Sequence, residues 1–205
     1  KARISWIAHP APARLLQDYQ FGLWEAELSR DGQWLVARAE DSTSDGNLRA
    51  RRLTGDTTLV PLVVSTENAT QAALSPDGHW LAYTSNSTGR TEIYVVPFPG
   101  AGSTRLISRD GGTEPRWARS GRELFYKSGN RLMAVSVTPG ATLGIGVPGP
   151  LFSVAEYTGA RNRQQYDVAP GDQRFLMIRQ GSSGERAEAI YVENWFAELK
   201  AKTAR

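Results

Sequence analysis

One short turn motif recurs four times along the 205-residue chain and constrains its fold more than any other feature. The first two copies share the pattern Leu-Ser-x-Asp-Gly-x-Trp-Leu, and successive copies lie 46, 43 and 51 residues apart. A period of about 40–50 residues is typical of a propeller blade built from four short strands. The turn residues of the four copies are Asp31 and Gly32, Asp77 and Gly78, Ser120 and Gly121, and Gly171 and Asp172.

The chemistry of this motif predicts a hairpin in each copy. An Asp side chain accepts hydrogen bonds from nearby backbone amides, and Gly adopts positive φ without steric cost. Apolar segments precede and follow each turn, and two further strand-like segments follow before the next copy. We therefore predict an all-β chain, a β-propeller of four-stranded blades with about four blades represented. The equivalent apolar residues after the turns should pack between blades; they are Leu35, Leu81, Leu124 and Phe175.

The ends of the chain differ from this repeat. A strand pair near residues 3–8 and 12–16 has no turn motif before it, and the last copy is followed by only one more strand, near 189–193. We expect residues 1–205 to form an arc of a larger ring, with a short helix near 195–200 in the tail 194–205. The alternative is a small closed ring completed by the first strands. An open arc should self-associate through its uncovered apolar faces.

Composition excludes several classes of function. The chain has no Cys and two distant His residues, so we expect no metal centre and no cofactor. The longest apolar run, residues 59–64, is too short to cross a bilayer, so no direct membrane insertion is expected. A net charge of +3 is too small to indicate nucleic-acid binding.

The motifs that resemble catalytic or ligand-binding signatures fail in their context. Residues 144–149 match G-x-G-x-x-G, but Pro148 and Pro150 oppose the helix that a dinucleotide site needs. Residues 41–46 resemble the start of a calcium loop, but Arg52 stands where a bidentate Glu is required. The chain has no G-x-S-x-G, so no catalytic residue is predicted.

Four polar residues occupy one aligned position, six residues before the Asp position of each turn. They should begin the innermost strand of each blade, beside the mouth of the central channel. One interpretation is a rim that contacts a ligand or peptide, carried mainly by Glu25 and Glu114. The other is that each side chain caps backbone groups of its own blade. The four residues are Glu25, Gln71, Glu114 and Gln165.

The repeat around residues 74–83 resembles the TolB-like, WD-repeat-like β-propellers of bacteria. Residues 86–99, 111–117, 121–126 and 194–200 are similar to the propeller that lies C-terminal to bacterial Ser/Thr protein kinases. This resemblance implies a non-catalytic module outside the cytoplasmic membrane, tethered through a segment absent from this sequence. A protein, peptide or small ligand would bind at the channel face. Ser120 and the reversed Gly171 and Asp172 depart from the family's turn and should weaken those two turns.

Two other functions and another location stay open at this point. The chain contains no Val-Ala-x-Lys, His-Arg-Asp or Asp-Phe-Gly kinase motif. It is also compatible with the substrate-gating propeller of a prolyl-oligopeptidase-type serine peptidase, or with a freestanding TolB-like periplasmic adaptor. A cytoplasmic location is the alternative to an extracytoplasmic one.

Overall fold

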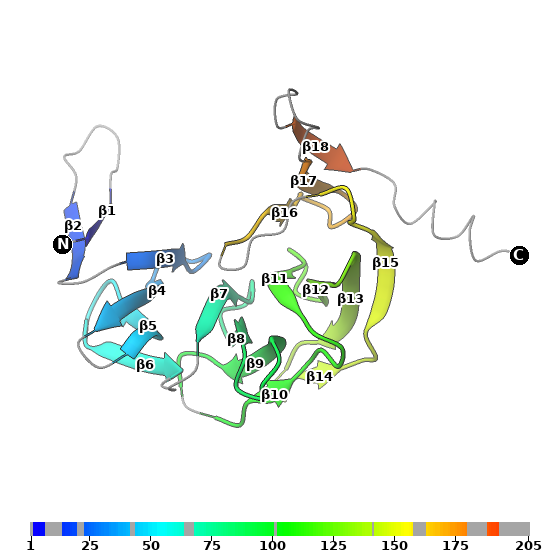
Figure 1. The fold of residues 1–205 in the computed structure, drawn as a ribbon. Coiled ribbons are helices and arrows are strands. Elements are labelled where there is room, and N and C mark those ends of the chain that lie inside the picture. Colours follow the sequence, from blue (N-terminus) through cyan, green and yellow to red (C-terminus); the bar gives the residue numbers. More distant parts are fainter. Residues whose placement is uncertain are drawn as a thin grey trace, which may run out of the picture.

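The computed structural model describes residues 2–6, 14–19, 23–41, 44–63, 68–100, 102–140, 142–157, 163–179 and 188–192. Within these ranges the chain forms only strands, turns and irregular connections, which confirms the predicted all-β class. The four sheets formed between residues 23 and 192 follow one another around an arc, each with its first strand toward the centre (Figure 1). The predicted helix near 195–200 lies outside the described residues. No helix within them is long and apolar enough to span a membrane.

Two antiparallel sheets have the predicted four-stranded blade topology. The first has the order β3-β4-β5-β6, and the second has the order β10-β9-β8-β7. The strands of the first blade are β3 (Leu23–Leu28), β4 (Trp34–Asp41), β5 (Ser44–Arg52) and β6 (Leu59–Val63). Those of the second are β7 (Ala69–Leu74), β8 (Trp80–Ser85), β9 (Glu92–Pro97) and β10 (Arg105–Leu106).

The remaining sheets depart from this plan. In the third blade two short strands, β14 and β15, both pair with β13, and the fourth blade has three described strands. A separate two-stranded sheet pairs β1 (Ala2–Trp6) with β2 (Arg14–Tyr19). The third blade contains β11 (Thr113–Trp117), β12 (Glu123–Ser128), β13 (Arg131–Thr138), β14 (Gly144–Ile145) and β15 (Gly149–Ser153). The fourth contains β16 (Tyr166–Val168), β17 (Phe175–Arg179) and β18 (Glu188–Val192).

The first two turns use identical hydrogen bonds. Ser29 Oγ donates to Asp31 Oδ1 at 2.5 Å and accepts from Trp34 N at 2.8 Å. Ser75 makes the same two contacts, with Asp77 at 2.5 Å and Trp80 at 2.9 Å. The following glycines have φ of 69° and 70° in the two turns. The Ser-x-Asp-Gly pattern therefore encodes one corner that the chain repeats.

The fourth turn keeps the left-handed position of the other three but has Asp there in place of Gly. Asp172 has φ of 61° and Gly121 has φ of 72° at the equivalent place in the third turn, while the preceding Gly171 also has a positive φ, of 87°, which Asp31 and Asp77 do not. The Asp172 carboxylate accepts from Arg119 N at 2.6 Å and from Ser120 N at 3.0 Å, both in the preceding turn. The reversed order thus turns the acidic side chain toward the neighbouring blade, where it binds the turn that lacks its own Asp.

Apolar side chains fill the space between successive blades. Val36 and Leu48 of the first blade pack with Leu81 and Tyr83 of the second. Between the third and fourth blades, the rings of Phe125 and Phe175 meet edge to face with centroids 5.0 Å apart. The four residues predicted to be core are all buried: Leu35, Leu81, Leu124 and Phe175.

Large apolar side chains are exposed on the two outermost blades. On β3, Trp24 and Leu28 are 55% and 37% exposed, and on β17, Leu176 and Ile178 are 45% and 38% exposed. Alternation along a strand places each pair on the face opposite to the packed one. Self-association through these faces stays a prediction.

Truncation of a leucine between blades should destabilise the chain far more than truncation of an exposed one. Leu81→Ala removes a side chain with no solvent exposure, so we expect the free energy of unfolding to fall by about 2–5 kcal/mol. Leu106→Ala, at a position that is 53% exposed, should change it by less than about 0.5 kcal/mol. Urea denaturation followed by tryptophan fluorescence measures both. Equal losses in the two variants would contradict the observed packing.

Candidate functional site

The four aligned polar residues lie at the inner ends of successive blades, as predicted, but two of them are fully enclosed. Gln71 on β7 and Glu114 on β11 are 1% and 0% exposed. Glu25 on β3 is half-buried, and Gln165 immediately precedes β16. Burial leaves Glu25 as the better placed of the two glutamates for the predicted ligand contact.

The backbone at this aligned position is irregular. The register of β7 against β8 shifts between Thr70 and Ala73, and that of β11 against β12 shifts between Thr113 and Arg116. Within these bulges Gln71 and Glu114 have φ of 55° and 56°. Non-glycine residues adopt this left-handed region only where surrounding contacts compensate its cost.

The compensating contacts link each blade to the next. Glu25 Oε2 accepts from Ala72 N at 3.3 Å, and Gln71 Oε1 accepts from Glu114 N at 2.9 Å. Glu114 Oε2 accepts from Gln165 N at 2.7 Å. The backbone donors therefore belong to the following blade, whereas one of the two interpretations of the sequence had these side chains capping their own blade. We call these three contacts the interblade latches.

Glu114 is also the centre of a buried charge network. Its Oε1 atom lies 3.1 Å from Lys127 Nζ, and both side chains are less than a tenth exposed. Tyr166 donates its hydroxyl to the carbonyl oxygen of Glu114 at 2.9 Å. Burial raises the pKa of Tyr166 well above its usual value, so the phenol stays protonated and acts as a donor. Lys127 thus supplies the positive charge that the buried carboxylate needs.

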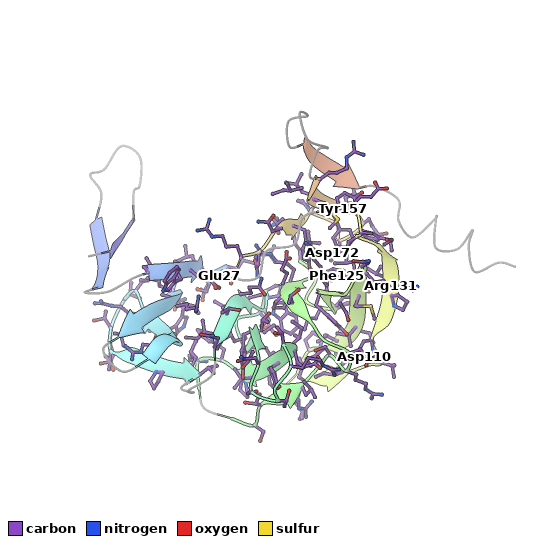
Figure 2. All side chains as sticks on the ribbon, in the orientation of Figure 1. Glu27, Asp110, Phe125, Arg131, Tyr157 and Asp172 are labelled. Atoms are coloured by element: carbon purple, nitrogen blue, oxygen red, sulfur yellow. The ribbon has the colours of Figure 1, made fainter. Side chains whose placement is uncertain are left out.

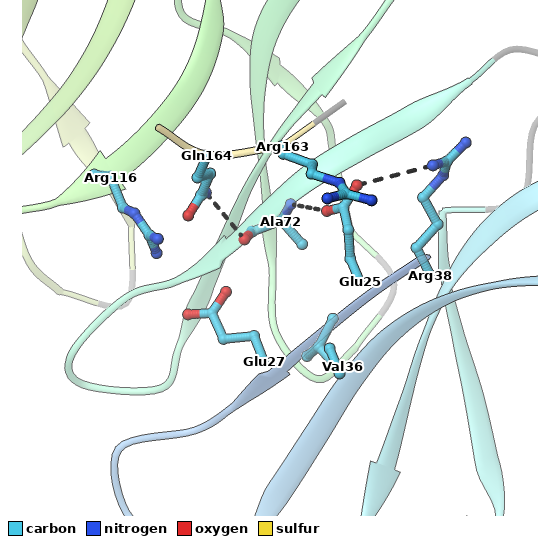
Figure 3. A pocket seen from close by; sticks show the side chains of 9 residues that line it. Glu25, Glu27, Val36, Arg38, Ala72, Arg116, Arg163 and Gln164 are labelled. Atoms are coloured by element: carbon cyan, nitrogen blue, oxygen red, sulfur yellow. Dashed lines mark hydrogen bonds and ion pairs between the residues drawn. The ribbon is translucent and has the colours of Figure 1, made fainter. Parts of the chain in front are cut away.

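A hollow of about 220 Å³ opens beside the first latch (Figure 3). A second hollow of about 270 Å³ adjoins it, and both are lined by Glu27 and Arg116. The charged side chains come from β3, β4, β11 and β16, from the segment before β16, and from turns that follow the innermost strands. Around the first hollow they are Glu25, Glu27, Arg38, Arg116 and Arg163, and the second adds Arg30, Arg119 and Asp167.

Glu27 has one carboxylate oxygen engaged and one unengaged. Its Oε1 atom accepts from Leu74 N at 3.1 Å, which adds a second link of this kind between the first two blades, beside that of Glu25. Its Oε2 atom is buried and has no hydrogen-bond partner among the described residues. Burial raises the pKa of Glu27 to about 7, against the lowering effects of the Leu74 amide and Arg116. Near neutral pH the Glu27 side chain is therefore protonated in part of the molecules and charged in the rest.

Arg116 presents an unengaged donor to the same space. Its Nε atom is buried and, like Glu27 Oε2, has no partner in the described part of the chain. In Figure 3 the side chains of Arg116 and Glu27 both point into the hollow. By contrast, Arg38 approaches Glu25 Oε1 at 3.9 Å, so the charge of Glu25 is balanced locally. Sequence reasoning missed Glu27, although alternation places it on the same face of β3 as Glu25.

Comparisons with known proteins establish the fold of this chain and do not establish a function. No protein-family model and no curated protein matches the sequence. TolB from Acinetobacter baumannii is similar in structure with a TM-score of 0.67 and 13% identity, over 93% of this chain and 49% of TolB. The structure of a prolyl endopeptidase matches with a TM-score of 0.57 and 15% identity, over 90% of this chain and 30% of that one.

A third similar structure is that of a puromycin hydrolase. It matches with a TM-score of 0.58 and 21% identity, over 88% of this chain and 28% of the hydrolase. The chain therefore spans about half the length of TolB and less of the two hydrolases. These likenesses show a TolB-like β-propeller fold.

Removal of the buried carboxylate at the third latch should destabilise the fold. Glu114→Ala removes the buried carboxylate that faces Lys127 and accepts from the Gln165 amide, so we expect a loss of about 3–5 kcal/mol. Thermal denaturation followed by circular dichroism measures the loss. Glu156→Ala, at an exposed position, is the matched control and should be nearly neutral. An unchanged melting temperature for Glu114→Ala would refute the structural role of the latch.

Glu27 should make stability depend on pH. Its pKa rises from 4.5 to about 7 on folding, so the folded chain binds the proton more tightly than the unfolded one. Its contribution to stability therefore falls as pH rises from about 4.5 to about 7 and is constant above that. The difference in unfolding free energy between the wild type and Glu27→Gln should shift by on the order of 1–3 kcal/mol across this window. Urea titrations at successive pH values test it, and a difference independent of pH would contradict it.

Proposed function

We propose that this chain, whose fold is that of the TolB-like β-propellers, is a non-catalytic module that binds a protein or peptide segment at the hollows in the centre of the arc. The observation that carries the proposal is the pair of unengaged buried polar atoms, Glu27 Oε2 and Arg116 Nε, on the walls of these hollows. Buried polar groups are normally hydrogen-bonded, so an unsatisfied pair at an opening favours a ligand that satisfies both.

The rigidity of the surrounding blades supports this role. Residues of the innermost strands β3, β7, β11 and β16 line the hollows, and the interblade latches join the inner ends of the blades to one another. Side chains held on a stiff scaffold lose little conformational entropy when a ligand binds, which favours affinity. The chain would thus present a preformed surface rather than perform chemistry.

The wider protein that we propose is a bacterial Ser/Thr kinase, with this chain as its C-terminal extracytoplasmic part, or a TolB-like protein. The strings at residues 86–99 and 111–117 support the kinase, and the likeness to TolB supports the second. Binding of an external partner at the hollows would then be the signal that the module receives.

A second candidate is the substrate-gating propeller of a prolyl-oligopeptidase-type serine peptidase. The structural likeness to a prolyl endopeptidase and to a puromycin hydrolase favours it. The coding sequence on either side of this segment separates the possibilities. A kinase domain upstream supports the first, a serine-hydrolase domain downstream supports the second, and a signal peptide without either domain supports a freestanding TolB-like adaptor.

Obstruction of the hollows tests binding directly. Gln164 lines the first hollow and is half-buried, so Gln164→Trp should fill the space. We expect peptides selected from a phage-displayed random library on the wild-type chain to bind this variant at least tenfold more weakly in calorimetry. Gln173→Trp, at an exposed position that lines neither hollow, is the matched control. Selected peptides that bind both variants like the wild type would overturn the proposed site.

A further inference from the structure

Arginine outnumbers acidic side chains around the two hollows. The five arginines that line the hollows face three carboxyl groups. One of the five, Arg38, forms an ion pair with Glu25, with 3.9 Å between Arg38 Nη1 and Glu25 Oε1. Two of the other four use part of their guanidinium for backbone carbonyls, since Arg30 Nη1 donates to Arg119 O and Arg119 Nε donates to Val168 O, each at 3.1 Å. The remaining excess of positive charge favours an anionic group over a cationic one.

The donor geometry narrows the kind of anion. An arginine side chain offers donors in a planar fork that matches a carboxylate or a phosphate, and Arg116 has its Nε atom buried and unengaged. Glu27 Oε2 stands on the opposite wall. A carboxylate between them can accept from Arg116 through one oxygen and share a proton with Glu27 through the other. A phosphate carries more negative charge and more oxygen atoms than a carboxylate. Some of these oxygens would lie close to the carboxyl groups of Glu27 and Asp167, which would repel them.

The size of the hollows limits how much of a partner can enter. Pockets for drug-sized ligands measure about 300–1,000 Å³, and the hollows here measure about 220 and 270 Å³. One side chain or one chain terminus fits this space, while the rest of a partner would lie over the opening.

We propose that the hollow between Glu27 and Arg116 binds a single carboxylate of an acidic peptide segment, with Arg116 as the anchoring cation and protonated Glu27 as a second donor. This inference rests on the proposed function and names the chemistry of its ligand. The carboxylate can belong to an Asp or Glu side chain or to a free C-terminus. Because Glu27 has to hold a proton in the complex, binding takes up a proton and weakens as pH rises.

The groups that face Glu27 determine how strongly pH acts. Arg116 on β11 lowers the pKa of Glu27, whereas Glu25 on β3 and Asp167 on β16 raise it. Arg30, Arg119 and Arg163 also line the two openings. Burial raises the pKa of Glu25 as well, against the lowering effect of Arg38. The pKa of Glu27 reaches about 7, so the charge of Glu27 changes between pH 6 and pH 8.

The test uses three short peptides and one inorganic anion. Acetyl-triglutamate amide carries only side-chain carboxylates, acetyl-trialanine with a free C-terminus carries only a terminal one, and acetyl-triglutamine amide carries none. Inorganic phosphate is the fourth probe. Calorimetry or NMR titration at pH 6 should show that one of the two carboxylate peptides binds at least tenfold more tightly than the glutamine peptide and phosphate. Which of the two binds identifies the source of the carboxylate.

Two variants with one matched control test the assigned residues. Arg116→Gln should weaken binding of the carboxylate peptide at least tenfold. Arg131→Gln, at an exposed β13 position away from Glu27 in Figure 2, should leave the affinity unchanged. The Glu27→Gln variant should bind the carboxylate peptide at pH 8 as tightly as the wild type does at pH 6, and its affinity should no longer depend on pH. A gain at pH 8 cannot arise from misfolding, so this variant keeps the test decisive if Arg116→Gln proves unstable.

The results separate failure of this inference from failure of the proposed function. If neither carboxylate peptide binds more tightly than the glutamine peptide, or if Arg116→Gln keeps its affinity for the one that binds, the proposed carboxylate ligand is wrong. If Gln164→Trp still blocks the selected peptides in that case, the binding module stands and only its ligand chemistry is wrong. If Gln164→Trp blocks nothing, the proposed function itself fails.

Discussion

The structure depends on side chains that leave one innermost strand and accept a hydrogen bond from the backbone of the next blade. Apolar packing between blades is strong but has little direction, so it tolerates sliding of one sheet over another. The latches from Glu25, Gln71 and Glu114 add direction, because each places an acceptor opposite one particular amide. They also satisfy backbone donors that the bulged strands leave without a ladder partner.

These contacts explain why the centre of the arc contains so much buried polar structure. Gln71 and Glu114 adopt left-handed backbone angles, and the contacts on both sides of each residue hold them there. Four buried side-chain atoms around the first hollow have no hydrogen bond to the described residues: Glu25 Oε1 and Arg38 Nε, whose side chains approach each other, and Glu27 Oε2 and Arg116 Nε. The scaffold and the candidate site thus share strands, and Glu27 serves both, since its Oε1 atom accepts from the next blade.

The differences among the four turn motifs also involve hydrogen bonds between neighbouring blades. The third turn has Ser120 where the first two have Asp, and Ser120 Oγ accepts from Arg122 N at 3.3 Å, as Asp31 Oδ1 accepts from Gln33 N. Asp172 of the fourth turn adds a carboxylate from the next blade, which binds two other amides of the third turn and lies at a left-handed angle that Asp tolerates. A departure from the repeat in one copy is therefore matched by a departure in the next.

By itself the sequence determined the all-β class, the repeating corner and the residues between blades, because turn chemistry and alternation are local properties. Ser-x-Asp-Gly specifies its corner within six residues, and Leu81 and Phe175 follow their turns at constant spacing. Tertiary structure alone decided which amide each latch side chain meets, since donor and acceptor lie more than 40 residues apart. It also brought Glu27 to Arg116, a pairing that depends on how blades stack around the centre and on no local pattern.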